Sequence, residues 1–352
     1  MSEYIERLTV KNYGCVKDVS VELTPLHAFI GPNDSGKSTL LRALRTVAQY
    51  GGGVFTNDQP FEPQFPAAEG FLGIVYPDKL AYKMGFLDGE FGEIVCVEGK
   101  PEVWSKVRDL MTRPGILGSR SDVPQIIELA RRLRPARFVR LYADSLRNSA
   151  SLLMDGDPVR FLDERGLGLP AIYDVIINHN VEAFLKILAN VRKLFPSVAR
   201  LGLSNISASH KVVEVTLKDG RRVPASGMSE GLLYYLAFAA LPSLSPTSVI
   251  LIEEPENGLH PARIAEVMGI LREVSKTTQV VIATHSPLVI NEMKPEEVSV
   301  VTRPPEKGTQ VTRIDRSPDF EDRAKVYALG ELWLSYADGD YESPLLEGGP
   351  RP

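Results

Sequence analysis

The chain has 352 residues, of which 43% are hydrophobic and 24% are charged, values typical of soluble globular domains. Its formal net charge of −5 does not indicate a general affinity for nucleic acid or anionic membranes. Its two cysteines, Cys15 and Cys96, are too far apart to suggest a disulfide framework or a zinc site. The N-terminus has no apolar signal core, and no apolar run reaches the roughly 20 residues of a membrane helix. We therefore expect a cytoplasmic protein without a membrane partner.

The first hundred residues have mainly strand patterns. Alternating or continuous apolar residues predict strands at 5–11, 16–23, 26–30, 70–76, 80–87 and 91–97. A helix is predicted over 38–50, where three glycines end it. Turn residues separate the last three strands, which predicts an antiparallel β-meander.

Helical patterns dominate the middle of the chain. Helices are predicted at 102–111, 123–134, 170–179 and 181–195, with a strand at 137–142. We expect residues 101–199 to be a mainly helical insertion that carries partner or DNA contacts. The insertion would interrupt a discontinuous domain made of residues 1–100 and 200–317, and residues 318–352 would form a C-terminal helix and a frayed tail.

The last third of the chain alternates between the two patterns. Strands are predicted at 199–205, 211–218, 222–224, 248–253, 279–283 and 296–302, and helices at 229–241, 261–275 and, apart from Gly330, 319–336. Two continuous apolar strands joined by a helix, 248–253 and 279–283, argue for a parallel βαβ unit. The fold class is therefore α/β.

A glycine-rich loop lies between the strand at 26–30 and the helix at 38–50. It fits the P-loop pattern G-x-x-x-x-G-K-[ST], whose backbone N–H groups face phosphates at a helix N-terminus. Lys37 can reach the β- and γ-phosphates, and the Ser38 hydroxyl can bind Mg²⁺. The predicted ATP-binding residues are Gly31, Pro32, Asn33, Asp34, Ser35, Gly36, Lys37, Ser38 and Thr39.

Acidic residues and a histidine follow two of the predicted parallel strands. Glu253 suits the carboxylate that holds the hydration shell of Mg²⁺, and Glu254 suits the group that polarises the attacking water. His285 follows the next strand, where it can face the γ-phosphate. Alternatively, the two glutamates form a surface turn and His285 is a structural histidine. The position of these residues at the ends of predicted parallel strands favours a catalytic role.

The segment around Ser229 has two interpretations. Ser229 can be the N-cap of the helix at 229–241. Alternatively, Ser229, Gly231 and the helix N-terminus form a second phosphate-binding site. Two such sites can surround one nucleotide if two copies of the chain meet head to tail.

The order of these motifs resembles the ABC-type ATPases of the SMC, RecF and OLD-like group. The segment from Glu253 to Pro261 is most similar to small stand-alone OLD-like members, and Asn12-Tyr13-Gly14 is similar to the opening of the group. The resemblance implies a P-loop NTPase with an ABC/SMC-type head, an N-terminal antiparallel β subdomain and a helical insertion. Between Ser38 and Ser229 the chain is too short for long coiled-coil arms.

The resemblance also implies a role for each matching residue. Lys37 and Ser38 would bind phosphates and Mg²⁺, Glu253 would take the Walker B acidic position, and Glu254 would be the catalytic base. Ser229 and Gly231 would contact the γ-phosphate held by the partner copy. Asn257 would lie in the loop that couples the two sites, and His285 would be the switch histidine.

The sequence departs from the family pattern in several places. Walker B ends in Glu-Glu instead of Asp-Glu, and the signature lacks the full Leu-Ser-Gly-Gly-Gln of transporters. Gln64 and, after it, Gln59 are the candidates for the Q-loop glutamine. No nuclease-like acidic cluster follows Pro287, so we expect no fused nuclease domain.

The function implied is Mg²⁺-dependent ATP hydrolysis that drives an ATP-sandwich homodimer. Its output would go to DNA or to a nuclease or other effector protein, in DNA repair and genome maintenance or in anti-phage defence. One alternative is a RecF-like, ATP-gated DNA-binding protein that uses a basic cluster, Arg131, Arg132, Arg134, Arg137 and Arg140. A solvated helix end is the favoured interpretation of that cluster. A transporter ATPase subunit is the weaker alternative.

Overall fold

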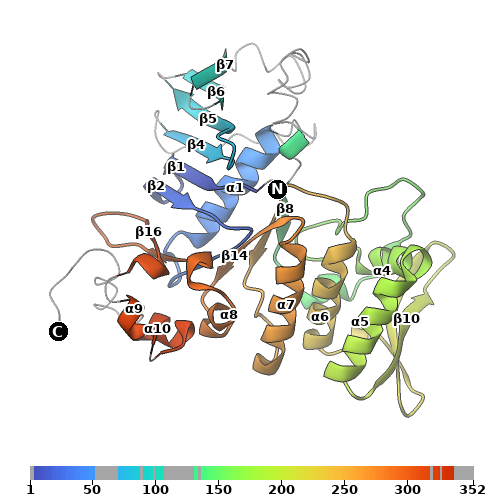
Figure 1. Cartoon of the computed structure of the whole chain (residues 1–352). Coiled ribbons are helices and arrows are strands. Elements are labelled where there is room, and N and C mark those ends of the chain that lie inside the picture. The colour runs from blue at the N-terminus through green and yellow to red at the C-terminus, as the bar shows by residue number, and fades with distance from the viewer. Residues whose placement is uncertain are drawn as a thin grey trace. The chain divides into compact units, whose positions relative to one another are not determined.

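The computed structural model in Figure 1 describes residues 4–51, 70–87, 90–97, 100–106, 131–133, 136–317, 320–325 and 327–336. Contacts divide the chain into two compact units. The first unit contains Met1–Phe138, Thr247–Glu254 and Ser275–Pro352, and the second contains Val139–Pro246 and Pro255–Val274. The division into a head and an insertion at 101–199 remains a prediction. In the described part of the chain, no helix is both long and apolar enough to cross a membrane.

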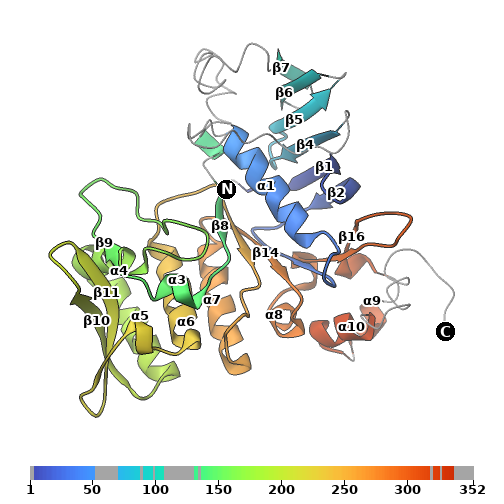
Figure 2. The same ribbon diagram turned by 180° about the vertical axis from the view of Figure 1, so that it is seen from behind.

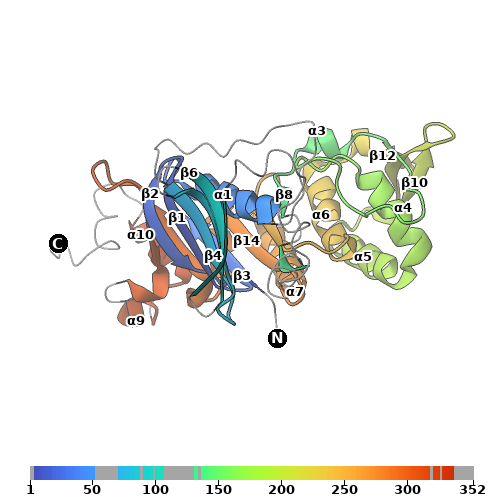
Figure 3. The ribbon, with the colours of Figure 1, turned by 90° about the horizontal axis from the view of Figure 1, so that it is seen from above.

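The first sheet of the first unit, sheet A, is antiparallel and has the order β2-β1-β4-β5-β6-β7 (Figure 1). Figure 3 shows its strands β2, β1 and β4 from above. Its strands are β1 (Arg7–Tyr13), β2 (Val16–Glu22), β4 (Gly70–Val75), β5 (Ala81–Leu87), β6 (Glu90–Val97) and β7 (Lys100–Lys106). The predicted meander is therefore confirmed. The helix predicted at 102–111 is wrong over 102–106, because backbone pairing with β6 extends the sheet by one strand there. Most of the helix predicted at 123–134 lies outside the described residues.

Sheet B has the order β16-β15-β3-β14-β13-β8. Its strands are β3 (Leu26–Ile30), β8 (Arg137–Val139), β13 (Val249–Glu253), β14 (Gln279–Thr284), β15 (Val298–Thr302) and β16 (Gln310–Arg313). The central strands β15, β3, β14 and β13 pair in parallel, which confirms the βαβ prediction. Every residue of these four strands is buried, as their continuous apolar runs require. β16 pairs antiparallel with β15 and was not predicted.

Helix α1 (Lys37–Gly51) and one glutamine connect sheets A and B. Leu40, Leu41 and Leu44 of α1 belong to a buried cluster that includes residues of both sheets. The buried Gln279 amide accepts a hydrogen bond from Ile5 N (2.9 Å) and donates to Ile5 O (2.9 Å) and Thr24 O (3.1 Å). Packing and hydrogen bonding thus hold the two sheets as one unit.

The C-terminal part of the first unit contains short helices, two of which lie where a longer helix was predicted at 319–336. Its helices are α8 (Pro287–Asn291), α9 (Phe320–Arg323) and α10 (Leu329–Tyr336), with 3-10 turns η6 (Pro295–Glu297) and η7 (Ile314–Arg316). α8 and α10 lie side by side (Figure 2), and the Gly330 N–H donates to Asn291 Oδ1 at 2.7 Å. This tertiary contact lies at the second residue of α10, which is the glycine excepted from the predicted helix.

The second unit contains a small antiparallel sheet, sheet C, and five helices. Sheet C has the order β10-β11-β12, with β9 also paired to β11. The strands are β9 (Ala150–Ser151), β10 (Val198–Asn205), β11 (His210–Leu217) and β12 (Arg222–Pro224). The helices are α3 (Ala143–Leu146), α4 (Leu169–His179), α5 (Val181–Leu194), α6 (Glu230–Ala240) and α7 (Ile264–Val274), with 3-10 turns η3 (Ala225–Gly227), η4 (Leu241–Ser243) and η5 (Pro261–Arg263). The predictions at 170–179, 181–195 and 229–241 match α4, α5 and α6 closely.

Candidate nucleotide-binding site

The glycine-rich loop leaves the buried strand β3 and enters α1 at Lys37. A Cβ on Gly31 would lie 2.0 Å from the Val301 carbonyl oxygen of β15, so a side chain does not fit there. Asp34 and Gly36 have φ angles of +62° and +110°. Left-handed residues of this kind are typical of loops whose N–H groups form a concave anion site. The structure therefore has the strand, loop and helix that the P-loop prediction requires.

The Lys37 ammonium closes this loop from its own helix. It donates to the carbonyl oxygens of Gly31 at 2.8 Å and Pro32 at 2.7 Å. These two bonds hold the positive charge at the mouth of the loop, where phosphate charge is expected. The buried Ser35 hydroxyl, in the same loop, has no hydrogen-bond partner within the described residues.

Glu253 and Glu254 take different positions at the end of β13. Glu253 is buried, with 7% of its surface exposed, and Glu254 is more exposed and has a φ of +49°. The Glu254 N–H donates to Ala283 O at 2.8 Å. This bond holds Glu254 at the end of β14, where its Oε1 lies 3.6 Å from His285 Nδ1. The structure thus brings the predicted base and the predicted switch histidine together.

The strand register places this acidic edge beside the P-loop strand. Glu253 pairs with Ala283 of β14, and Ala283 pairs with Phe29 of β3. Adjacent strands are about 4.8 Å apart, so the Glu253 backbone is roughly 10 Å from the end of β3. Ligands of parallel α/β sheets bind at this carboxyl edge.

The donor groups at this edge fit Mg²⁺ and a nucleoside triphosphate. Ser38, in the first turn of α1, supplies a hydroxyl, and Glu253 supplies a buried carboxylate. Mg²⁺ prefers such oxygen donors in combination with phosphate oxygens and water. The individual roles of these residues remain predictions.

Ser229 lies at the N-cap position of α6, but its side chain makes no capping hydrogen bond. Its carbonyl oxygen accepts from the N–H groups of Leu232 at 3.1 Å and Leu233 at 3.2 Å. The exposed Ser229 hydroxyl therefore does not cap the N–H groups of this helix. The N-terminus of this 11-residue helix presents a hydroxyl and unsatisfied N–H groups to the surface.

The loop after Glu254 packs against this same helix end. A Cβ on Gly231 would lie 3.2 Å from Gly258 O, and a Cβ on Gly258 would lie 2.0 Å from the Tyr234 ring. Asn257 is exposed next to this contact. The second unit thus brings Ser229, Gly231 and Asn257 together, whereas the P-loop, Glu253, Glu254 and His285 belong to the first unit.

One residue of the predicted basic cluster, Arg132, makes contacts within the first unit. Arg132 is bidentate to Asp78, at 2.9 and 2.7 Å, and stacks 5.1 Å from the Tyr76 ring. Hydrogen bonding from Arg132 holds the pKa of Asp78 below its usual value. The contact ties Arg132 to sheet A. Gln59, Gln64 and Arg134 lie outside the described residues.

Sequence reasoning missed the residues that hold the P-loop from outside. Thr309 Oγ1 donates to Ser35 O at 2.9 Å, and Arg303 Nη1 donates to Asp34 O at 3.4 Å. Both residues follow β15, far along the chain from the loop, and no motif marks them. Only the pairing of β15 with β3 brings them to the site.

Two family models match the chain in separate segments. An "AAA ATPase domain" model matches residues 4–71, and an "AAA domain, putative AbiEii toxin, Type IV TA system" model matches residues 118–291. The OLD nuclease of Thermus scotoductus (strain ATCC 700910 / SA-01) is 49% identical over 43 residues, which are 12% of this chain and 8% of that nuclease.

Solved SMC heads share the fold. An SmcHead bound to the C-winged helix domain of ScpA aligns with a TM-score of 0.56 at 16% identity, over 88% of this chain and 97% of that one. A second solved structure is an Smc head domain with an extended coiled coil, bound to the C-terminal domain of ScpA derived from Pyrococcus furiosus. It aligns with a TM-score of 0.56 at 15% identity, over 92% of this chain and 99% of that one.

Proposed function

We propose that this chain, an AAA-family ATPase of the SMC/OLD-like group, binds ATP with Mg²⁺ between two copies of itself and opens the dimer on hydrolysis. ATP binding and hydrolysis follow from the family matches. The dimer and its output are the proposal. Each composite site would combine the P-loop, Glu253, Glu254 and His285 of one copy with Ser229 and Gly231 of the other.

The observation that carries the proposal is the N-terminus of α6. The Ser229 hydroxyl is exposed and makes no capping bond, and Gly231 has no side chain, which lets the Gly258 carbonyl oxygen approach the helix end. A helix N-terminus with an available hydroxyl suits a phosphate. The chain already has a complete P-loop, so the second phosphate-binding surface is explained by a nucleotide that another copy holds.

Bound Mg²⁺-ATP would supply the electrophilic γ-phosphate and the positive charge that stabilises it. The residues of this chain would do the rest. Lys37 holds positive charge at the loop mouth, and the Glu254 carboxylate accepts the proton of the attacking water. His285, 3.6 Å from Glu254, keeps that carboxylate oriented.

The experiment is light-scattering mass of Glu254→Gln with and without Mg²⁺-ATP. This substitution removes the base but keeps the shape, so nucleotide binding should persist while the closed form accumulates. We expect the mass to double only with ATP. Adding Ser229→Arg should abolish the doubling while ATP binding to the P-loop is retained. An unchanged mass in Glu254→Gln would contradict ATP-driven dimerisation.

A mixing experiment is the matched control for the composite site. Lys37→Ala spoils the P-loop and Ser229→Arg spoils the opposite surface, so each variant alone should be inactive. In an equal mixture, each mixed dimer has one intact site out of two, so part of the wild-type ATPase activity, at most about a half, should return. No recovery in a mixture that does form mixed dimers would rule out sites shared between copies.

The likeness to SMC heads that are bound to a ScpA domain supports, by analogy, a protein partner for this chain. The short match to an OLD nuclease favours a nuclease as effector and a role in anti-phage defence or DNA repair. Capture of a nuclease by the ATP-bound Glu254→Gln form, but not by the nucleotide-free form, would support this output.

A second candidate, ATP-gated DNA binding, is favoured by an arrangement that shares only Arg140 with the predicted basic cluster. Tyr142 is 42% exposed, and the guanidinium carbons of Arg140 and Arg165 lie 5.9 and 5.3 Å from its ring centroid. Backbone bonds from Arg140 N to Glu164 O and from Tyr142 N to Arg165 O hold the two segments together. Exposed aromatic rings between cations suit nucleic-acid bases and phosphates.

A further inference from the structure

The outer side of the P-loop is held by a second loop, residues 303–309, which joins β15 to β16. Thr309 is the fully buried end of this loop, with 0% of its surface exposed. The Thr309 Oγ1 lies 2.9 Å from Ser35 O. A Cβ on Gly36 would lie 2.6 Å from Thr309 Oγ1. The Thr309 side chain is therefore in direct contact with the Ser35–Gly36 peptide.

The hydrogen of the Thr309 hydroxyl goes to the P-loop. Its other possible acceptors, Cys15 O at 3.5 Å and Cys15 Sγ at 3.6 Å, are farther than Ser35 O. A hydroxyl has one proton to donate, and O–H···O bonds are optimal below 3 Å. The bond to Ser35 is thus the strongest that this side chain can make.

This bond determines the direction of a phosphate-binding N–H. In a planar trans peptide the C=O and the N–H of the same unit point to opposite sides. Holding Ser35 C=O toward Thr309 therefore turns the Gly36 N–H away from the 303–309 loop. Gly36 has a φ of +110° and no Cβ, so the peptide would otherwise rotate easily. Backbone N–H groups of a P-loop are the groups that cradle phosphates.

We propose that Thr309 is a positioning residue for nucleotide binding, which acts by fixing the Ser35–Gly36 peptide so that the Gly36 N–H faces the phosphates. The inference rests on nucleotide binding by the P-loop, and it does not depend on the dimer. It adds to the site a residue that no P-loop motif includes. The same 303–309 loop also contacts the P-loop through Arg303, which donates to Asp34 O at 3.4 Å.

The chain offers a matched control in Thr302, the last residue of β15. Thr302 is also 0% exposed, but its Oγ1 has no hydrogen-bond partner within the described residues. Substituting Val removes one buried hydroxyl at either position, with nearly the same volume. Only the Thr309 change removes a bond to the P-loop.

The experiment is isothermal titration of ADP and of ATP, with Mg²⁺, into wild type, Thr309→Val, Thr309→Ser and Thr302→Val. We expect Thr309→Val to lower the affinity for both nucleotides by about three- to ten-fold, the range for one lost hydrogen bond. Thr309→Ser retains the donor, and Thr302→Val leaves the loop unchanged, so both should bind within about two-fold of wild type. The melting temperature without nucleotide is measured for each variant.

Two results would overturn the inference. One is an unchanged nucleotide affinity in Thr309→Val, whatever its melting temperature, because Thr309 would then only stabilise the fold. The other is an equal loss in Thr302→Val, which would assign the effect to packing of the loop. If Thr309→Val does not fold, Thr309→Ala makes the same comparison with less crowding. Failure of wild type to bind ADP or ATP would instead contradict nucleotide binding itself.

Discussion

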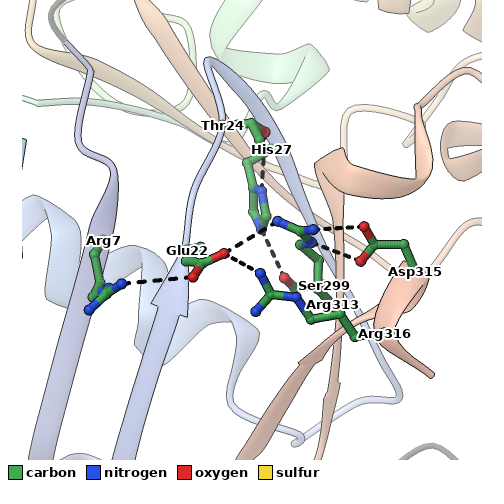
Figure 4. A network of polar contacts seen from close by, with 8 residues as sticks. All are labelled: Arg7, Glu22, Thr24, His27, Ser299, Arg313, Asp315 and Arg316. Atoms are coloured by element: carbon green, nitrogen blue, oxygen red, sulfur yellow. Dashed lines mark hydrogen bonds and ion pairs between the residues drawn. The ribbon is translucent and has the colours of Figure 1, made fainter. Parts of the chain in front are cut away.

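His27 illustrates how one buried side chain on β3 acquires a special titration behaviour. Its ring nitrogens lie 3.3 Å from Thr24 Oγ1 and 3.0 Å from Ser299 Oγ (Figure 4). Complete burial, and after it the positive charge of Arg313, lower the pKa of His27 from 6.5 to about 3. Asp315 binds Arg313 through two oxygens, at 2.8 and 2.7 Å, and raises its pKa, so that charge is permanent. His27 is therefore neutral in the folded protein near neutral pH.

This pKa predicts a loss of stability in mild acid. Below about pH 6.5 the unfolded chain binds a proton at His27 that the folded chain does not bind until about pH 3, so the free energy of unfolding falls with falling pH. The loss is up to about 1.4 kcal/mol per pH unit in that window. We expect His27→Gln, which can retain the bond to Ser299, to lack this pH-dependent loss. The difference in free energy of unfolding between wild type and His27→Gln should therefore narrow as the pH falls from 6.5 to 4.5.

Urea unfolding at several pH values measures this effect. His179→Gln, at an exposed position at the end of α4, is the control for replacing a histidine by glutamine. Parallel stability curves for wild type and His27→Gln would show that His27 does not carry the acid sensitivity.

At the scale of elements, Gln279 shows what joins sheet A to sheet B. Its buried amide makes three hydrogen bonds to backbone groups of Ile5 and Thr24. Gln279→Leu would leave these groups buried without a partner, and each orphaned group costs about 1–3 kcal/mol. We expect a loss of about 3 kcal/mol in the free energy of unfolding of the first unit.

Gln310→Leu is the matched control for this prediction. The Gln310 amide donates to Lys307 O at 3.4 Å and Thr309 O at 3.1 Å, but its side chain is only partly buried. Water can replace these bonds, so the expected loss is below about 1 kcal/mol. Thermal unfolding followed by circular dichroism compares the two. Equal losses would mean that the Gln279 bridge contributes little.

Elements were predicted best where one local pattern decides them. The continuous apolar runs of β3, β13 and β14 require burial on both faces, which only a parallel sheet between layers provides. β7 was missed because its pairing with β6 overrides a helix-like local pattern. The region predicted as helical at 319–336, apart from Gly330, contains the shorter helices α9 and α10, and a contact with α8 lies at the start of α10.

At the scale of the whole molecule, the net charge of −5 gives no general attraction to DNA. DNA binding must therefore come from a local surface, for which the Arg140–Tyr142–Arg165 arrangement is the candidate. Arg165→Glu in the ATP-trapped Glu254→Gln form should weaken DNA binding about ten-fold at low salt, and lower the slope of log affinity against log salt by about one.

Tyr142→Ala should weaken single-stranded DNA more than double-stranded DNA, because stacking needs unpaired bases. Arg200→Glu, an exposed position on β10, is the control for a general charge effect. Fluorescence anisotropy over a salt series measures these affinities. An equal loss in Arg165→Glu and Arg200→Glu, or no DNA binding in any form, would remove the second candidate function.

The sequence by itself determined the motifs and their order along the chain. Gly31, Gly36 and Lys37 are restricted by local requirements: a backbone without Cβ, a left-handed φ, and a cation within reach of the loop. An apolar strand precedes each of three motifs: the P-loop, Glu253 and His285. These strands likewise predicted the α/β fold and the sheet edge that carries the site.

Only the tertiary structure decided which distant residues meet. It placed His285 3.6 Å from Glu254, bound Arg132 to Asp78, and left the Ser229 side chain without a capping bond. It also brought Thr309 to Ser35, 274 positions away along the chain. Local patterns do not encode such contacts, because strand pairing and packing select them from many side chains of equal local propensity.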